Sequence, residues 1–261
     1  MAFSEKFHEN RDIALQGKTT RERGTEKTIK AISWVYRWGY SFPTILDQIG
    51  NVKARGLTAK LVKKGILKET KTGLSAGFKG VPNKILTLTN LGMQIAETHT
   101  EIQYSYETDP HRVRQDQLHH YFIAQKLTID AVNNHKIQYF KTEKEYAAFS
   151  ENGVKQPDVI WVNSDNEQIG IEVELTGKWE RKLDQFVDSS LKALKVIGGE
   201  SRLDYIVIFA ESDALIKRYK AAFQADCKYS KWVKNQRGYW QKDIELTVPS
   251  WITGRILCKK L

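Results

Sequence analysis

The stretch PDVIWVNSDNEQIGIEVELTGK, residues 157–178, decides the fold of the second half of the chain. It contains two strand-like segments, 158–162 and 169–175, which are rich in valine and isoleucine. The turn-forming sequence Ser164-Asp165-Asn166 lies between them. Two such segments joined by a tight turn predict an antiparallel β-hairpin.

The acidic residues of this hairpin are expected to lie on one face. Glu172 and Glu174 are two residues apart, so their side chains point the same way along a strand. Asp158 begins the first strand and can reach that face near Glu172. Carboxylates held this close repel one another unless a cation lies between them, and an oxygen-rich cluster suits Mg²⁺ or Mn²⁺. The three acids are therefore candidate metal ligands; the alternative is that Glu-x-Glu marks only a solvated strand face.

The segments on either side of the hairpin alternate between helical and strand-like patterns. The second half of the chain is therefore expected to be a mixed α/β (α+β) domain in the order helix, three strands, helix, strand, helix. The flanking elements are expected as a helix over 114–133, a strand over 136–140 with a further candidate strand over 146–149, a helix over 178–197, a strand over 202–210 and a helix over 212–223.

The first half of the chain has a different order of elements. Apolar spacing and turn signals predict a helix, two shorter helices, two strands and a closing helix. This order resembles a winged helix-turn-helix. The sequence Leu61–Leu67 is similar to the usual passage from the recognition helix to the first wing strand. The sequence Leu88–Gly92 is similar to the usual exit from the second wing strand. The expected elements are helices over 26–38, 43–49 and 52–64, strands over 66–69 and 84–88, and a helix over 89–97.

Positive charge is concentrated in this first half. The chain has a formal net charge of +10, and residues 51–84 contain nine basic residues and one acid, a local charge of 9 − 1 = +8. A localised basic patch favours a nucleic-acid partner; the alternatives are a solvated surface and a winged helix used for protein contact. The predicted third helix can enter the major groove while the wing lies on the backbone. The candidate DNA-binding residues are Lys53, Arg55, Lys60, Lys63, Lys64, Lys71 and Lys79.

Composition excludes several other classes of protein. No apolar run reaches the roughly 18–20 residues that a membrane helix needs. The first residues lack the basic-then-apolar order of a secretory signal, and the two cysteines are too few for a disulfide framework or a four-ligand zinc site. We therefore expect a cytoplasmic protein. Its expected parts are a basic arm (1–25), a winged helix (26–100), a linker (101–112) and a second domain with a C-terminal extension (113–261).

The hairpin motif resembles the signature of the PD-(D/E)xK nuclease superfamily. Pro157-Asp158 is followed by Glu172-Val173-Glu174, with Glu174 where the superfamily usually has lysine. The sequence Glu172–Lys178 is similar to that of MobC-type and replication-relaxation family plasmid relaxases, which also carry an N-terminal winged helix. The resemblance covers about residues 26–225. It implies a restriction-endonuclease-like αβββαβ core. The usual lysine would be replaced by Lys178 or Lys182 on the next helix, or by neither; we favour Lys178.

The same resemblance implies roles for the site residues. Asp158 and Glu172 would hold Mg²⁺ or Mn²⁺, Glu174 would bind the metal through water or position the nucleophile, and Lys178 would contact phosphate. The relaxase branch also implies a catalytic histidine on the first helix of this domain, where His119 and His120 are adjacent. We favour His120, four residues after Asp116 on the same helix face; the alternative is an ordinary buried or surface histidine.

The expected activity is metal-dependent DNA cleavage, by a relaxase that nicks one strand at a plasmid origin of transfer during conjugative mobilisation. Two alternatives are a winged-helix regulator with an inactive nuclease-like domain and a restriction- or transposition-type endonuclease. The expected partner is duplex DNA, with an adjoining single strand, accessory mobilisation proteins and a second copy of the chain as further candidates. The aromatic residues of the basic C-terminal extension could stack on single-stranded bases, cover the domain edge or form an oligomer interface: Trp232, Tyr239, Trp240 and Trp251.

Overall fold

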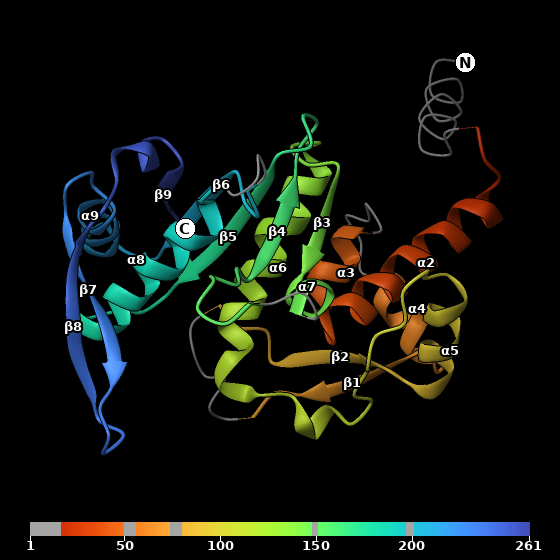
Figure 1. Ribbon diagram of the computed structural model, residues 1–261. Coiled ribbons are helices and arrows are strands. Elements are labelled where there is room, and N and C mark those ends of the chain that lie inside the picture. The colour runs from red at the N-terminus through yellow and green to blue at the C-terminus, as the bar shows by residue number, and fades with distance from the viewer. Residues whose placement is uncertain (1–16, 50–55, 74–79, 148–150, 197–200) are drawn as a thin grey trace. The chain divides into compact units, whose positions relative to one another are not determined.

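The computed structural model describes residues 17–49, 56–73, 80–147, 151–196 and 201–261. The chain forms two compact units, Met1–Asp116 and Gln117–Leu261, and each contains helices and at least one sheet (Figure 1). The segment 101–112, where we expect a linker, lies wholly in the first unit. Short 3₁₀ helices occur at Pro110–Arg112, Gln115–Gln117 and Ser250–Ile252.

The first helix of the first unit starts earlier than the apolar pattern predicts. Helix α2 spans Thr20–Trp38, so residues 20–25 of the expected arm are helical. The cause is a capping box, in which the Thr19 side chain accepts from the Glu22 backbone N–H and the Glu22 carboxylate accepts from that of Thr19. The helix ends at Gly39, which has the left-handed φ of 87° typical of a C-terminal cap.

Two short helices follow. Helix α3 spans Pro43–Ile49 and α4 spans Leu57–Lys63. The expected continuous helix over 52–64 is wrong at Gly56, which is not helical and precedes α4; residues 52–55 lie outside the described residues. Thr58 in the first turn of α4 donates its hydroxyl to the Asp47 carboxylate at 2.9 Å, which ties α4 to α3.

A β-hairpin and a last helix complete the first unit. Strands β1 (Leu67–Lys71) and β2 (Lys84–Leu88) are antiparallel, and Ser41 forms a β-bridge with Leu86 at the other edge of β2. Helix α5 spans Asn90–Thr98 and begins at a cap by Thr89. Gly92 is required here, because a Cβ at this position would lie 2.2 Å from the Ile66 carbonyl oxygen.

The core of the first unit forms between α2 and the β-hairpin. Tyr36 is fully buried, and its hydroxyl both donates to the Tyr104 carbonyl and accepts from the Tyr104 N–H. Tyr106 stacks on the same ring and accepts a hydrogen bond from Leu88 N. These contacts fix the segment after α5 on the first unit. Other side chains of this core are Ile32, Val35, Phe42, Ile45, Leu46, Leu61, Leu67, Ile85 and Leu86.

The second unit is built on a five-stranded sheet with the order β3-β4-β5-β6-β9. Strands β3, β4 and β5 are antiparallel, and β6 and β9 add in parallel to β5 and to one another. The predicted hairpin is confirmed, since Val159 on β4 pairs with Ile171 on β5. The strands span Tyr139–Thr142 (β3), Val159–Val162 (β4), Gln168–Glu174 (β5), Tyr205–Ala210 (β6) and Ile256–Lys260 (β9).

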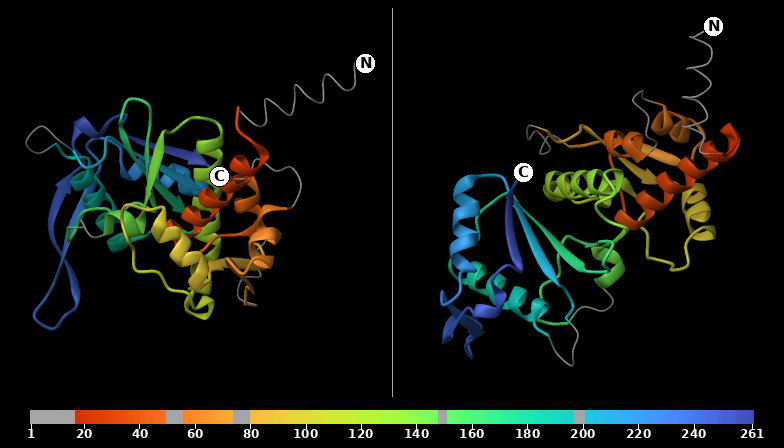
Figure 2. Two further views of the ribbon diagram at one scale, coloured as in Figure 1. Left: turned by 90° about the vertical axis from the view of Figure 1, so that its right-hand side faces the viewer. Right: turned by 90° about the horizontal axis from the view of Figure 1, so that it is seen from above.

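Helices cover both faces of this sheet (Figure 2). Helix α6 (Leu118–Asn133) lies on one face, where Thr128 accepts a hydrogen bond from the Trp161 indole at 3.0 Å. Helices α8 (Glu180–Leu194) and α9 (Asp213–Ala222) cover the other face. Phe186 and Tyr219 from these two helices meet there at 5.7 Å between ring centroids.

Two parts of the second unit differ from the prediction. The candidate strand over 146–149 is wrong at its start, because Tyr146 ends the short helix α7 (Glu143–Tyr146), which a second capping box begins; residues 148–149 lie outside the described residues. The expected C-terminal extension is regular structure: β7 (Lys228–Lys234) and β8 (Trp240–Thr247) form an antiparallel ribbon, and β9 joins the main sheet. Over the part of the chain that the structure describes, no helix combines the length and apolarity needed to cross a membrane.

Candidate active site

The β4–β5 hairpin brings Asp158 beside the end of β5. Asp158 lies one residue before β4, and its N–H donates to the Ile171 carbonyl at 3.0 Å. Its carboxylate accepts from the Val173 N–H at 2.7 Å. Two backbone-directed hydrogen bonds therefore fix the position of Asp158 opposite Glu172 and Val173.

His120 approaches the same acid from helix α6. Its Nε2 lies 3.2 Å from Asp158 Oδ2 and 3.0 Å from the Val173 carbonyl oxygen. Burial lowers the pKa of His120, but the hydrogen bond and charge of Asp158 and the charge of Glu172 outweigh burial, so the net pKa is raised. Of the two adjacent histidines, the structure brings His120 to the acids. Asp116, whose spacing from His120 favoured this histidine in the sequence, forms an ion pair with Arg114.

Glu172 is the most deeply buried acid of the site, with 3% of its surface exposed. Lys155 Nζ forms an ion pair with Glu172 Oε1 at 2.8 Å. Beyond this ion pair, Glu172 Oε1 has no hydrogen-bond partner among the described residues. Burial, together with the charge of Asp158, raises the pKa of Glu172 to about 7 against the opposing charge of Lys155. A buried carboxylate of this kind favours an additional positive partner.

Glu174, a candidate metal ligand from the sequence, has partners for both oxygens of its carboxylate. One oxygen of its carboxylate is paired with Lys178, and the other accepts a 2.9 Å hydrogen bond from the Tyr219 hydroxyl. The same hydroxyl accepts from Lys178 N at 3.2 Å. Both oxygens of Glu174 are thus engaged, and the arrangement fixes the position of Lys178 next to the other acids.

The two lysines of the site share one aromatic ring. Lys178 Nζ lies 4.4 Å and Lys155 Nζ 5.7 Å from the centroid of Phe186, which is buried on α8. Burial lowers the pKa of Lys178 to about 8, with the charge of Lys155 acting in the same direction and Glu172 and Asp158 opposing it. Lys178 therefore keeps its positive charge at neutral pH but holds its proton less strongly than an ordinary lysine.

Sequence reasoning missed three residues of this cluster. Lys155 lies in a loop before β4, and no local pattern marks it. Tyr219 follows the helical spacing of an ordinary core residue. The Tyr146 hydroxyl is buried without a hydrogen-bond partner in the part of the chain that the structure describes, and the charges of Asp158 and Glu172 raise its pKa together with burial. Only tertiary contacts reveal these three.

A divalent cation fits part of this cluster. Among the described residues, no three His, Cys, Asp or Glu side chains converge as a ready-made metal site. Asp158 and Glu172 nevertheless offer two carboxylates, and Glu172 Oε1 has only the Lys155 ion pair as a partner. His120 Nε2 lies near both Asp158 and the Val173 carbonyl, which brings this carbonyl close to the acids. Oxygen ligands of this kind suit Mg²⁺ or Mn²⁺. Glu174 does not fit as a direct ligand while Lys178 and Tyr219 hold it.

Four of the basic residues that we expect to contact DNA are described, and all four are exposed on the first unit. Lys60 and Lys63 lie in the last turn of α4, Lys64 follows it, and Lys71 ends β1. The other three, Lys53, Arg55 and Lys79, lie outside the described residues.

Comparisons with known protein families, with characterised proteins and with solved structures find no match to this chain.

Proposed function

We propose that the chain is a metal-dependent DNA endonuclease whose second unit cleaves a phosphodiester. One observation carries the proposal: the buried acid Glu172 lies at the end of β5 beside Asp158, with the cations Lys155 and Lys178 at the same place. Burying several charges in one cluster costs stability unless they are paired. A site that binds and transfers an anion explains why two lysines and two acids are kept together.

Asp158 and Glu172 would hold the Mg²⁺ or Mn²⁺ ion, with the Val173 carbonyl beside them. The ion supplies positive charge next to the phosphate and makes water a better nucleophile. Asp158 is already fixed by the Val173 N–H at 2.7 Å, so little reorganisation is needed. His120 lies within hydrogen-bond distance of Asp158 and can orient its carboxylate or exchange a proton near it.

Lys178 would contact the phosphate and stabilise the negative charge that develops on it. Glu174 and Tyr219 act as positioning residues, because they hold Lys178 from both sides of one carboxylate. Lys155 neutralises Glu172 and brings a second positive charge to the cluster.

The first unit would bind duplex DNA as a winged helix. The order of helices α2, α3 and α4, the β1–β2 hairpin, the closing helix α5 and the additional bridge at Ser41 support this assignment. Lys60, Lys63 and Lys64 would approach the phosphate backbone near the groove, with Lys71 in the wing. More specifically, we propose a relaxase that nicks one DNA strand at a plasmid origin of transfer. The alternative is an endonuclease that acts in restriction or transposition.

A second candidate function is a DNA-binding regulator with an inactive nuclease-like unit. The pairing of Glu174 with Lys178 and of Glu172 with Lys155 favours it, since the cluster then satisfies most of its own charges.

A plasmid-nicking assay tests the proposal. Supercoiled plasmid carrying an origin of transfer is incubated with the chain and Mg²⁺ or Mn²⁺, and Glu172→Ala is compared with Asp165→Ala, which removes an exposed acid from the turn of the same hairpin. We expect nicking by the native chain and Asp165→Ala but not by Glu172→Ala. If the native chain binds the plasmid without nicking it, the result supports the regulator. If it cuts both strands, the result supports the restriction-type enzyme. A denaturing gel shows whether protein stays covalently attached to DNA.

A further inference from the structure

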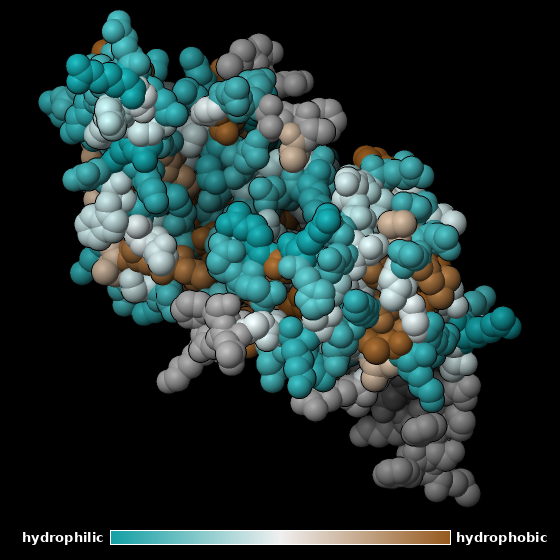
Figure 3. All heavy atoms as spheres, turned by 90° about the horizontal axis from the view of Figure 1, so that it is seen from below, coloured by the Kyte–Doolittle hydropathy of each residue, from teal (hydrophilic) through white to brown (hydrophobic). Residues whose placement is uncertain are grey.

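The β7–β8 ribbon of the second unit carries aromatic and basic side chains on an exposed hairpin. Residues 228–247 contain five basic residues and two acids, a local charge of 5 − 2 = +3. Seven of the eight residues of β8 are exposed. Figure 3 shows mainly hydrophilic side chains over the left part of its view, where the second unit lies. A basic, exposed ribbon of this kind has no role in the site described above.

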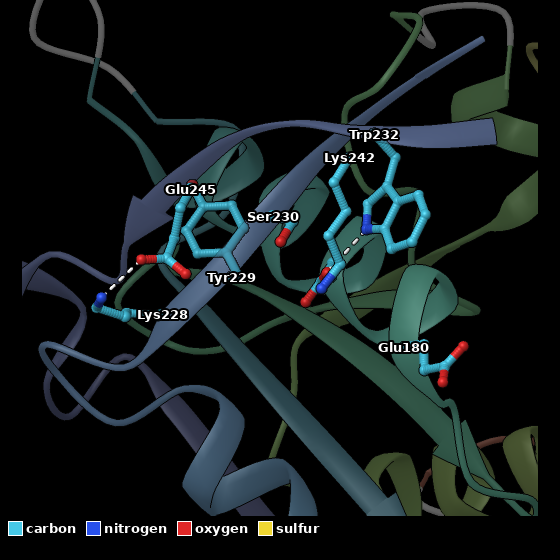
Figure 4. Close-up of a pocket in the computed structure, with 8 residues that line it drawn as sticks. Glu180, Lys228, Tyr229, Ser230, Trp232, Lys242 and Glu245 are labelled. Carbon is cyan, nitrogen blue, oxygen red and sulfur yellow. Dashed lines mark hydrogen bonds and ion pairs between the residues drawn. The ribbon is translucent and has the colours of Figure 1, made fainter. Parts of the chain in front are cut away.

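Two cavities lie where the ribbon meets helix α8, one on each side of Trp232, with volumes of about 370 and 380 Å³. The first is shown in Figure 4, where Lys242 lies beside Trp232, with its Nζ 5.7 Å from the centroid of that ring. Its acids, Glu180, Asp184 and Glu245, outnumber its two lysines. Asp184 accepts from the Trp232 indole at 2.8 Å and Glu245 pairs with Lys228 at 2.6 Å, so this cavity disfavours a phosphodiester.

The second cavity has the opposite character. Trp232 and Trp240 line it from the ribbon, together with Lys231. From α8 it is lined by Gln185, Asp188 and Lys192, which share one face of the helix by their spacing. Two lysines oppose one acid, and Asp188 is already paired with Lys192 at 2.6 Å. The cavity therefore combines aromatic rings, an amide and net positive charge.

Trp240 is held in place by cations while much of its surface stays exposed. The guanidinium of Arg181 lies 4.7 Å and the ammonium of Lys234 lies 5.4 Å from its ring. The residue is nonetheless 41% exposed. An aromatic ring that is fixed, exposed and surrounded by positive charge is suited to stack on a nucleobase and attract its phosphates.

We propose that the groove between α8 and the β7–β8 ribbon binds single-stranded DNA, with an unstacked base in the cavity next to Trp240. The Gln185 amide and the Asp188 carboxylate can hydrogen-bond the edge of that base, and Lys231 lies near its phosphates. A duplex is disfavoured here, because its bases are stacked and their faces cannot reach a tryptophan ring. The choice of DNA rests on the proposed function, which would produce or hold a single strand beside the cut.

Fluorescence anisotropy with a labelled 20-nucleotide single strand tests this inference. The measurement is made in EDTA, so that it does not depend on cleavage, and an unlabelled duplex competes. The variants are Trp240→Ala and the matched control Trp251→Ala, which removes a tryptophan of similar exposure, 43%, outside the ribbon. We expect Trp240→Ala to weaken single-strand binding roughly ten-fold or more, with Trp251→Ala unchanged and Trp240→Phe in between.

Three outcomes would overturn the inference. The first is equal single-strand binding by Trp240→Ala and the native chain. The second is a loss of duplex binding in Trp240→Ala as large as its loss of single-strand binding, because the first unit, not the ribbon, is expected to hold duplex. The third is a dimer, seen by light scattering, that Trp240→Ala dissociates without any single-strand binding. Loss of the proposed nuclease function would look different, since the native chain would then bind the single strand but not nick plasmid.

Discussion

Lys178 pairs with Glu174, four residues before it, and the Tyr219 hydroxyl holds the other oxygen of the same carboxylate at 2.9 Å. Glu174 occupies the position where the motif usually has lysine. It holds Lys178, which lies in the loop between β5 and α8. This relationship gives Lys178 a fixed place beside Glu172 and Asp158, and it motivates the first prediction.

Lys178→Ala should reduce the rate of plasmid nicking by about 100-fold or more, because it removes the charge that stabilises the phosphate in the transition state. Lys182→Ala is the matched control, since this lysine is exposed in the first turn of α8 and should change the rate little. Single-turnover rates with saturating protein separate catalysis from binding. Equal loss in both variants would contradict a specific role for Lys178.

Glu172 and Glu174 should respond differently to metal. Mn²⁺ should raise the melting temperature of the native chain, because a ligand that binds only the folded state stabilises it. We expect Asp158→Asn and Glu172→Gln to lose this shift and Glu174→Gln to keep most of it, since the Glu174 carboxylate is held by Lys178 and Tyr219. Differential scanning fluorimetry with and without Mn²⁺ makes the comparison. Complete loss of the Mn²⁺-dependent rise in melting temperature in Glu174→Gln would show that Glu174 binds the metal.

The stability of the metal-free chain should fall as pH rises from about 5 to about 7. The folded-state pKa of Glu172 is raised from 4.5 to about 7, so within this window the folded chain holds a proton that the unfolded chain has released. The free energy of unfolding therefore decreases with pH. In urea titrations with EDTA, Glu172→Gln should remove this decrease, a difference on the order of 1–3 kcal/mol by pH 7. Parallel pH curves for the two proteins would show that Glu172 is not the cause.

The basic residues around α4 should dominate the salt dependence of duplex binding. Replacing Lys60, Lys63 and Lys64 by glutamine should weaken binding and lower the slope of log K against log salt by about 0.9 for each phosphate that the protein no longer neutralises. Lys126→Gln, at an exposed lysine on α6 of the second unit, is the control. Binding curves at several salt concentrations measure the slope. An unchanged slope in the triple variant would place the duplex elsewhere.

Gly92→Ala should destabilise the first unit, because the added Cβ would lie 2.2 Å from the Ile66 carbonyl oxygen. Backbone must shift to relieve this overlap, which costs about 1–3 kcal/mol or more. Urea unfolding measures the destabilisation, and Gly24→Ala, at an open helical position, is the matched control. Equal stability of the two variants would mean that α5 can move away from β1 at little cost.

Local sequence patterns predicted much of the architecture and the acidic part of the site. The β4–β5 hairpin followed from its turn and its strand-like segments, and its register places Asp158 opposite Glu172. The early start of α2 was also readable, since Thr19 and Glu22 have the spacing of a capping box. The apolar period alone could not show it, because the first turn of α2 is polar.

Other features depend on contacts between distant residues. Strand β9 is a short run, Ile256–Lys260, that becomes a strand only by pairing with β6. Lys155 reaches Glu172 from a loop, and Tyr219 reaches Glu174 across 45 positions in the chain. The periodicity of apolar residues in the sequence does not predict these contacts, because they form only when the sheet and its helices pack together.

The β7–β8 ribbon is inserted between α9 and β9, and its two ends are paired, Lys228 with Thr247. The chain thus enters and leaves the ribbon at nearly the same point. The base of the ribbon belongs to the core through Tyr229 and Leu246, whereas lengthening, shortening or exchanging its outer part would leave the strand order of the main sheet unaltered. This outer part is free to diversify, so preference for a target strand could be changed by grafting a different tip while Asp158, Glu172 and Lys178 stay as they are.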